Sequence, residues 1–278
     1  MKKFLYPADI LMPKCDLSKW SVIACDQYTS DKAYWDRVKA FVGENPSSLN
    51  LILPEIYLDE SETRVDKINI TMKEYIDSGV FETVSSSMIY VKRKFPNDKI
   101  RCGIVGMINL EDYDYKKGSS SLIRATEETV IERIPPRVKI RKDAYLEMPH
   151  ILLFIDDPDN IVMGCVENNS CDFDIAYDFK LMENSGMIKG YYINSATQNL
   201  INEKLSTLVR DGLLFAVGDG NHSLASAKES HNINNTEKSK FALVEVVNIH
   251  DSSIEFEPIY RVLFGVNKNE IISEMKNY

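Results

Sequence analysis

The sequence predicts a mixed α/β fold, because apolar β-type runs alternate along the chain with segments of helical spacing. Two β-rich runs at 87–95 and 100–110 are separated by Pro96-Asn97-Asp98-Lys99, which is typical of a turn and predicts an antiparallel hairpin. Further along, the apolar run 213–217 ends in Gly218-Asp219-Gly220-Asn221-His222, directly before a helix-compatible segment. Strands mixed with helices in this way indicate an α/β or α+β architecture.

Size and charge limit the class of partner. A chain of 278 residues with 44% hydrophobic residues can fill a substantial core. The 33 Lys and Arg against 42 Asp and Glu give a formal net charge of −9, which opposes broad contact with nucleic acid or an anionic membrane surface. We therefore expect a small polar or phosphorylated ligand, no nucleic-acid partner and no membrane partner. The oligomeric state stays open.

The cysteines and the first residues indicate a cytoplasmic protein. Five scattered cysteines without a Cys-x-x-Cys pair indicate neither a disulfide framework nor a structural zinc site. Asp9 and Pro13 interrupt the first apolar stretch before it reaches the length of a signal-peptide core, and no apolar run is long enough to span a membrane. We expect reduced cysteines and a cytoplasmic location.

Local signals predict the elements of the N-terminal part. The short apolar run at 21–25 predicts a strand, and the spacing of apolar residues at 31–41 predicts an amphipathic helix. A second helix is expected at 61–78, because Ser61 is a suitable N-cap and Gly79 a suitable residue just past the C-terminus. With the hairpin, these elements make up an N-terminal α/β part.

In the C-terminal part, a helical pattern at 122–134 is expected to stop at Pro135-Pro136. The other expected elements are strands at 151–155, 173–182, 187–193, 241–249 and 255–264, and helices at 196–210 and after His222, followed by a charged amphipathic piece at 269–278. We divide the chain into an N-terminal α/β region with the hairpin, residues 1–110, and an α/β region with the Asp-Gly-Asn-His loop, residues 111–278.

The loop that begins at Gly218 predicts an anion-binding site. Gly218 and Gly220 permit positive φ and a close approach of ligand to backbone. The first amides of the following helix, at Asn221 and Ser223, point outward without an intrahelical partner. Phosphate is the anion that suits such a site.

Asp219 and His222 could add chemistry to that loop. Asp219 can hold Mg²⁺ or act as a general base, and His222 can donate to a phosphoryl oxygen or move a proton. The alternative is a plain strand-to-helix turn, in which Asn221 caps the helix and Asp219 bonds a loop amide. Short glycine motifs fit both interpretations.

Basic residues are dense between Arg124 and Lys142, with Glu127 and Glu128 among them. Helical spacing would place Arg124 and Glu128 on one face, four residues apart. One interpretation is an anion clamp formed by Arg124 beside a carboxylate base, Glu127 or Glu128. The alternative is a solvated charged helix.

Two further motifs offer ligands. Asp156-Asp157-Pro158-Asp159 follows an expected strand, where Asp157 could bind a divalent cation, although an Asx-Pro turn explains the same residues. In Glu257-Pro258-Ile259-Tyr260-Arg261, Arg261 could hold phosphate or carboxylate in bidentate fashion, and taken alone it is a surface arginine.

Taken in order, these motifs resemble the bacterial domain-of-unknown-function family 1015. The segments that support the resemblance are Arg124-x-x-Glu127-Glu128, Phe154-Ile155-Asp156-Asp157-Pro158, Gly218-Asp219-Gly220-Asn221-His222-Ser223-Leu224-Ala225 and Pro258-Ile259-Tyr260-Arg261. The family typically reads Asp-Gly-His-His-Arg and Pro-Ile-His-Arg, so this chain departs from it at Asn221, Ser223 and Tyr260. The resemblance implies one contiguous family domain whose C-terminal part is missing here.

The Asp-Gly-x-His loop is also similar to the phosphate-binding loop of the ParB and sulfiredoxin-like superfamily, whose free-serine kinases use it with a nucleotide and Mg²⁺. This implies a ParB/sulfiredoxin-like core with antiparallel hairpins and flanking helices. It also implies a phosphotransferase that takes a nucleotide or pyrophosphate as donor, uses Mg²⁺ and acts on a small hydroxyl metabolite such as serine.

Under this hypothesis each candidate residue has a role. The catalytic residues are Asp219, His222, Glu127 and Glu128, the phosphate-binding residues are Gly218, Gly220, Asn221, Ser223, Arg124 and Arg261, and the metal ligands are Asp219 and Asp157. The alternative is a non-catalytic nucleotide- or anion-sensing module, which needs the anion site but no base. A DNA-binding or nuclease role is disfavoured by the acidic composition.

Overall fold

The protein is a mixed α/β structure. The computed structural model describes residues 2–24, 28, 30–127, 134–148, 151–255 and 264–277. The strands are β1 (Ala8–Pro13), β2 (Phe81–Ser87), β3 (Ile89–Lys94), β4 (Ile100–Asn109), β5 (Tyr113–Asp114), β6 (Ile123–Arg124), β7 (Leu152–Ile155), β8 (Ile175–Lys180), β9 (Met187–Tyr192), β10 (Phe215–Asp219) and β11 (Phe241–Asn248). The helices are α1 (Leu17–Trp20), α2 (Lys32–Val42), α3 (Ser61–Asp77), α4 (Ile134–Lys142), α5 (Ile161–Asn169), α6 (Ser195–Thr207), α7 (Asn221–Asn234) and α8 (Lys268–Asn277).

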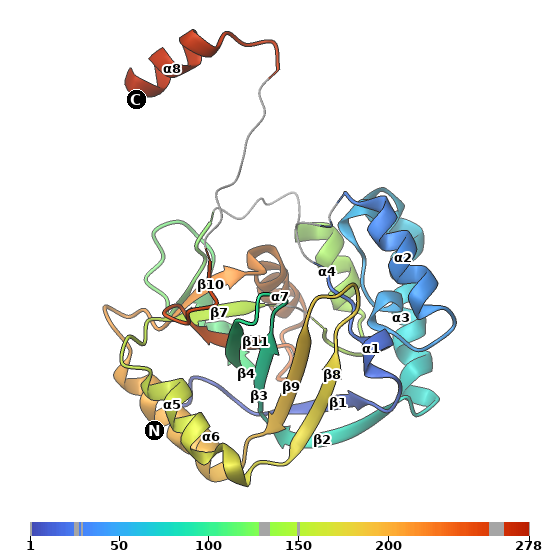
Figure 1. Cartoon of the computed structure of the whole chain (residues 1–278), viewed down its shortest axis with the longest axis vertical. Coiled ribbons are helices and arrows are strands. Elements are labelled where there is room, and N and C mark those ends of the chain that lie inside the picture. Colours follow the sequence, from blue (N-terminus) through green and yellow to red (C-terminus); the bar gives the residue numbers. More distant parts are fainter. Residues whose placement is uncertain are drawn as a thin grey trace.

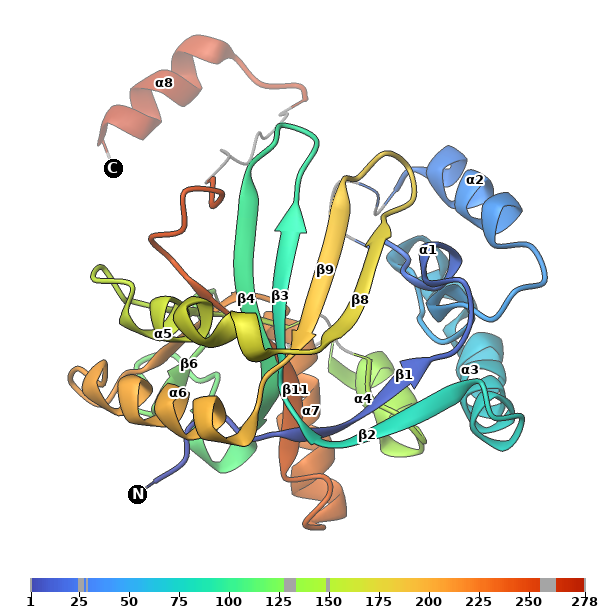
Figure 2. The same cartoon turned by 60° about the horizontal axis from the view of Figure 1, so that its bottom comes forward.

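The described strands form a nine-stranded mixed sheet in the order β5-β6-β10-β7-β11-β4-β3-β9-β8 and a separate two-stranded ribbon, β1-β2 (Figure 1). In the large sheet β4 and β3, which precede residue 110, lie between β11 and β9, which follow it, so the two regions share one sheet. Helices α1, α2 and α3 lie beyond its β8 end (Figures 1 and 2). The predicted mixed α/β class is confirmed.

Strand direction decides which loops meet. β6 is parallel to β10, β10 is antiparallel to β7, and β7 is parallel to β11. The ends of β6 and β10 therefore lie beside the beginnings of β7 and β11, at what we call the loop edge. The ends of β7 and β11 lie at the opposite edge, which we call the far edge.

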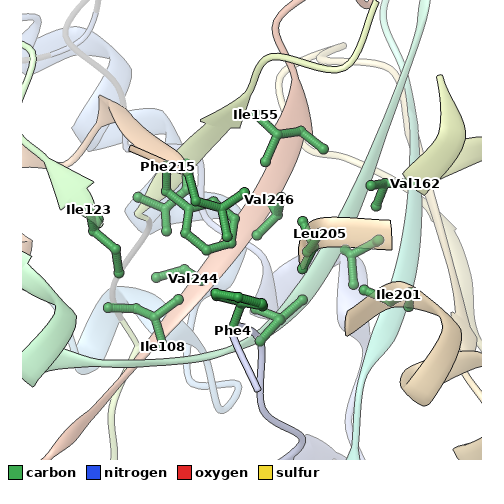
Figure 3. Close-up of a cluster of buried hydrophobic side chains, with 14 of the residues drawn as sticks. Phe4, Ile108, Ile123, Ile155, Val162, Ile201, Leu205, Phe215, Val244 and Val246 are labelled. Carbon is green, nitrogen blue, oxygen red and sulfur yellow. The ribbon is translucent and has the colours of Figure 1, made fainter. Parts of the chain in front are cut away.

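One face of the sheet forms the main core. Along β11, Ala242, Val244 and Val246 are buried, whereas Leu243 and Glu245 between them are only partly covered. Helices α5 and α6 lie side by side on the buried face (Figure 2). Figure 3 shows side chains from strands and helices gathered there, among them Ile123, Ile155, Phe215, Val244, Val246, Val162, Ile201 and Leu205.

The other side, which we call the open face, is less covered and more polar. Residues paired directly across strands share a face, so the register places Asp219, Leu152, Glu245 and Val105 in one row of it. Arg101 stands on the same face, four residues before Val105 on β4. The sheet thus has one mainly apolar face, whereas the central row of the other face includes Asp219 and Glu245.

Most expected elements are present. The 87–110 hairpin is β3-β4, and the runs at 151–155, 173–182, 187–193 and 241–249 contain β7, β8, β9 and β11. The expected helices at 31–41, 61–78 and 196–210 are α2, α3 and α6, and β10 leads directly into α7. The piece at 269–278 lies in α8, and most of the expected strand at 255–264 lies outside the described residues.

Several described helices begin at a residue type that is typical of an N-cap. Asp31 accepts from the Tyr34 amide at the start of α2, and Asn194 accepts from the Thr197 amide at the start of α6. Gly79, with φ of +70°, follows α3 as expected. The predicted N-cap Ser61 is wrong, because the N-cap of α3 is Glu60, which makes no side-chain cap bond.

Two expected elements are wrong. Residues 21–24 are not a strand, because they lie beside α2 and bond side chains: the Val22 amide donates to Ser48 Oγ, and Ile23 accepts from the Tyr34 hydroxyl. The expected 122–134 helix is instead β6 at its start, residues 128–133 of it lie outside the described residues, and α4 begins at Ile134. Pro135-Pro136 therefore starts a helix, since the first turn needs no amide donors.

The sequence did not indicate the β1-β2 ribbon or α5. The chain enters the ribbon through Tyr6, which exchanges two backbone bonds with Met107 of β4. The buried Asn202 of α6 accepts from the Phe4 and Leu5 amides at 2.7 and 3.1 Å. These long-range bonds fix the N-terminal segment. Among the described helices, none has the length and apolar character needed to cross a membrane.

Glycine substitutions test the packing of the open face. A Cβ at Gly190 would lie 2.4 Å from the ring of Tyr177, so we expect Gly190→Ala to lower the free energy of unfolding by about 1–3 kcal/mol. In the control Gly164→Ala, inside α5, the nearest atom would be 3.9 Å away. That variant should gain about 0.5–1 kcal/mol from the helical preference of alanine. Urea denaturation measures both, and an unchanged Gly190→Ala midpoint would contradict the packing described.

Candidate functional site

The candidate loop begins with a β-bulge at the end of β10. Val217 pairs with Leu153 and Asp219 with Leu152, so Gly218 is the additional residue. The ring of Phe154 lies against Gly218, where a Cβ would be 2.3 Å from a ring carbon. Glycine is therefore required here, because the Phe154 ring occupies the space that a Cβ would need. The bulge turns Asp219 outward, where it is exposed.

Gly220 starts α7 in the left-handed conformation, with φ of +81°. Its carbonyl accepts the first intrahelical bond, from the Leu224 amide at 2.9 Å. The amides of Asn221, His222 and Ser223 precede that bond, as an anion site at a helix start requires. The predicted capping role of Asn221 is wrong, since Gly220 is the N-cap.

One alternative interpretation of Asp219 is confirmed. Its Oδ1 accepts from the Gly220 amide at 2.6 Å, so the side chain holds its own loop. The carboxylate is nevertheless exposed and stands beside the first turn of α7. It can stabilise the turn with one oxygen and present the other to a cation.

Asn221 joins the loop to the segment after β6. Its side chain is buried, and its Oδ1 accepts from the Thr126 amide at 3.3 Å. The Thr126 hydroxyl donates to the Val217 carbonyl at 2.6 Å. These bonds hold residues 125–127 beside the end of β10, which places Glu127 at the loop edge.

Glu127 and His222 meet there, as the functional hypothesis requires. Glu127 Oε1 is 4.0 Å from His222 Nδ1, and the two side chains are 60% and 16% exposed. A carboxylate beside an imidazole can orient the ring and share a proton with it. The loop edge thus combines backbone amides, an exposed carboxylate and a group that can accept a proton.

Arg124 contacts the other end of β10. Its Nε donates to the Ser121 carbonyl at 2.8 Å and its Nη2 to the Asp211 carbonyl at 3.0 Å. Asp211 precedes β10, whereas Asp219 ends it, so Arg124 supports the turn before the strand. Glu128 and Arg261 lie outside the described residues, and their roles stay predictions.

Asp157 lies at the far edge and supports α5. Leu152, opposite Asp219, and Ile155 are three residues apart on β7, about 10 Å, and Asp157 lies beyond Ile155. Its two carboxylate oxygens accept from the Ile161 and Val162 amides at 2.9 and 2.8 Å. The Asn160 amide bonds its carbonyl, which closes the turn around Pro158. Asp157 and Asp219 are therefore not brought together.

Asp156, next to it, belongs to an exposed ion cluster of the far edge. Its Oδ1 lies 2.7 Å from His250 Nε2, and its Oδ2 accepts from Arg210 at 3.1 Å. The hydrogen bond to His250 is the main reason why the pKa of Asp156 falls below its usual value. Within the described ranges, no three His, Cys, Asp or Glu side chains gather closely enough to hold a metal ion.

Two charged residues of the open face were not identified as candidate site residues from the sequence. Glu245 of β11 stands in the row of Asp219, with Leu152 between them, and pairs with Arg101 of β4. The available signal was Val244-Glu245-Val246, a carboxylate inside an expected strand. Strand order and register, which the sequence does not give, were needed to place it near the loop.

Comparison with known proteins gives one match. A family model described as "Protein of unknown function (DUF1015)" matches residues 5–278. No curated protein matches the chain, and no solved structure matches it. The family match covers the hairpin, the loop edge and the open face, and it assigns no role to any of their residues.

The hydrogen bonds of Asp157 lead to a prediction about the folding stability of the protein. Asp157→Ala leaves two amides at the start of α5 without their acceptor, so we expect it to lower the free energy of unfolding by about 1–3 kcal/mol. Asp159→Ala changes an exposed carboxylate of the same turn and should stay within about 0.5 kcal/mol of wild type. Urea denaturation with and without Mg²⁺ measures this, and a Mg²⁺-dependent loss in Asp157→Ala would restore the metal role.

Proposed function

We propose that this chain, which belongs to the DUF1015 family, is a phosphotransferase that binds a phosphorylated donor at the Asp219 to His222 loop. The acceptor is a small hydroxyl metabolite such as serine. The observation that supports this most is the meeting of the α7 start, the exposed Asp219 and the Glu127–His222 pair at the loop edge. Such an arrangement provides an anion site, a cation ligand and a proton acceptor together.

The first turn of α7 would hold the donor. The amides of Asn221, His222 and Ser223 point out of a 14-residue helix, whose dipole favours an anion at this end. Gly220 adds no side chain that would block the approach. A nucleotide or pyrophosphate presents the phosphoryl oxygens that these amides would bind.

Asp219 is the residue that would hold Mg²⁺. This ion is usually bound through one or two protein carboxylates together with phosphate oxygens of the substrate, so one exposed carboxylate fits. When bound, Mg²⁺ would neutralise charge on the donor. We leave Asp157 out of this set, because both its oxygens bond α5 at the far edge.

The proton balance assigns a role to Glu127. The acceptor hydroxyl oxygen attacks the terminal phosphorus of the donor, and the bond from that phosphorus to the bridging oxygen breaks. The bridging oxygen leaves with the electron pair. The hydroxyl proton goes to Glu127, directly or through His222. Glu128 is the second candidate for the base, and Arg124 and Arg261 are retained as candidate phosphate contacts.

The mixed sheet supports a broader proposal about the fold, and the proposed substrates support one about the location. Antiparallel hairpins, flanking helices and an Asp-Gly-x-His loop at a helix start are the features expected of a ParB/sulfiredoxin-like core. Nucleotides, pyrophosphate and serine are small metabolites of the cytoplasm, where we place the reaction. The proposal needs no nucleic acid and no membrane.

One observation favours a second candidate, a nucleotide- or anion-sensing module. Oδ1 of Asp219 already bonds the Gly220 amide, so the carboxylate serves the loop without any metal. A sensing module would use the same amides to bind an anion and would need no proton acceptor. Glu127 separates the two functions, because only catalysis requires it.

Loss of Asp219 should abolish turnover. With pyrophosphate or a nucleotide as donor, Mg²⁺ and serine, we expect Asp219→Ala to lower kcat/KM at least about 100-fold, because the cation ligand is removed. Asp159→Ala, an exposed carboxylate of the far edge, should keep wild-type activity. Phosphate release and phosphoserine formation are measured together. If the wild type forms no phosphoserine from any of these donors, the phosphotransferase is wrong.

Glu127→Gln separates catalysis from sensing. It keeps the shape of the side chain and removes the proton acceptor, so turnover should fall about 100-fold or more while donor affinity stays the same. Calorimetric titration with pyrophosphate and Mg²⁺ measures the affinity. Donor binding without turnover in the wild type, unchanged by Glu127→Gln, would favour the sensing module.

A further inference from the structure

Thr126 lies just past the point where the pairing of β6 with β10 ends. The last paired residues are Arg124 and Ala216, so the Val217 carbonyl follows the last pair of the ladder. The Thr126 hydroxyl donates to that carbonyl at 2.6 Å. A side chain thus continues the contact between the two segments after the strand itself has stopped.

The main chain of Thr126 is held from the other end of the candidate loop. Its amide donates to Oδ1 of Asn221 at 3.3 Å, and Nδ2 of Asn221 donates to its hydroxyl oxygen at 3.5 Å. Val217 and Asn221 are the residues on either side of the loop at 218–220. Thr126 therefore bonds both ends of that loop, and we call these three hydrogen bonds the Thr126 clamp.

The residue type suits this position. The side chain of Thr126 is exposed overall, yet its hydroxyl points inward to a main-chain carbonyl. Threonine is stiff at χ1, because its Cβ bears two heavy atoms. The donor is therefore fixed relative to the main chain of residue 126. Valine has nearly the same shape without the donor, and serine keeps the donor on a freer side chain.

Glu127 depends on this clamp for its position. It follows Thr126 directly, its side chain is 60% exposed, and its Oε1 lies 4.0 Å from His222 Nδ1. That distance is too long for a hydrogen bond, so the contact with His222 does not hold the carboxylate by itself. Among the residues that the structure describes, the hydrogen bonds that join residues 125–127 to β10 and α7 are those of the Thr126 clamp.

The anion site has hydrogen bonds of its own and does not need the clamp. The Gly220 amide donates to Asp219 Oδ1, and the Leu224 amide donates to the Gly220 carbonyl. The Ser226 hydroxyl donates to the His222 carbonyl at 2.7 Å. These bonds lie within the loop and α7, so a change at residue 126 leaves them in place. Donor binding and the placement of Glu127 are therefore separable by experiment.

We propose that Thr126 is a positioning residue of the phosphotransfer reaction, which holds the carboxylate of Glu127 where the acceptor hydroxyl loses its proton. This inference rests on the proposed function. Thr126 contacts neither the donor nor the acceptor and acts through Glu127. A misplacement of about 1 Å in a reacting group can cost about 100-fold in rate, so a hydroxyl outside the reaction can set kcat.

The test compares Thr126→Val with Thr126→Ser, using pyrophosphate or ATP as donor, Mg²⁺ and L-serine. We expect Thr126→Val to lower kcat about 10-fold or more and to keep the calorimetric affinity for the donor with Mg²⁺, because the anion site is intact. Thr126→Ser restores the hydroxyl and should stay within about 3-fold of the wild-type kcat.

The matched control is Thr207→Val in α6. Thr207 is also exposed, and its hydroxyl also donates to a main-chain carbonyl, that of Lys204 at 2.7 Å. The same substitution therefore removes the same kind of bond away from the loop edge. It should leave both kcat and donor affinity at the wild-type values.

A double variant separates positioning from general support of the fold. If Thr126 acts through Glu127, its hydroxyl has nothing left to position once Glu127 is replaced by glutamine. Thr126→Val/Glu127→Gln should then have the kcat of Glu127→Gln alone, within about 2-fold. Losses that multiply in the double variant would overturn the proposal, and so would a wild-type kcat in Thr126→Val.

Crystal structures of Thr126→Val and Thr126→Ser decide the matter even if the wild type forms no phosphoserine. We expect the Glu127 carboxylate to leave the side of His222 in Thr126→Val and to remain there in Thr126→Ser. A carboxylate that stays 4.0 Å from His222 in Thr126→Val would refute the clamp, whatever the activity. A displaced carboxylate in a protein without turnover would instead refute the proposed function and leave the placement of Glu127 by Thr126 intact.

Discussion

The buried side chain of Asn221 connects the parts of the candidate site. It stands in the first turn of α7 and accepts from the Thr126 amide, while the Thr126 hydroxyl donates to the Val217 carbonyl. Without these bonds the segment after β6 would be held near β10 only by the short β6-β10 pairing, which stops at Arg124. Glu127 would then not be held beside His222. The catalytic proposal therefore depends on a polar contact that is itself out of reach of a ligand.

The two faces of the sheet around this contact differ in the side chains that they bear. The face under α5 and α6 is apolar and buried, and it provides the stability of the fold. The open face bears Arg101 and Glu245, with Asp219 at its edge, and glycines beneath the polar side chains make room for them. Buried polar side chains also occur on the side of α5 and α6, among them Asp157, Asn202 and Asn248.

Local patterns in the sequence predicted much of the fold. The β3-β4 hairpin, β7, α6 and the passage from β10 into α7 follow from apolar periodicity and turn residues, which act over a few positions. Glu127 and His222 were both candidate site residues, but their proximity to each other was not predicted. The strand at the start of the 122–134 segment was not predicted, because β6 is only two residues long and the spacing of the apolar residues there also fits a helix. Pro135-Pro136 signals a helix start as well as a helix end.

What the sequence could not provide was strand direction and register. Asp157 and Asp219 each follow an apolar run, and nothing local shows that β7 and β10 run in opposite directions. The pairing therefore separates two carboxylates that the motif pattern suggested would share a cation. The same pairing places Glu245 in the row of Asp219. Both facts depend on bonds between residues far apart in the chain, which periodicity does not encode.

The central claim is that the ligand site lies at the loop edge, and crystallography of the full chain with pyrophosphate and Mn²⁺ in place of Mg²⁺ tests it most directly. We expect an anomalous peak within coordination distance of the Asp219 carboxylate and a phosphate on the amides of Asn221 to Ser223. Pyrophosphate seated instead on Arg210 at the far edge, with no metal at Asp219, would contradict it.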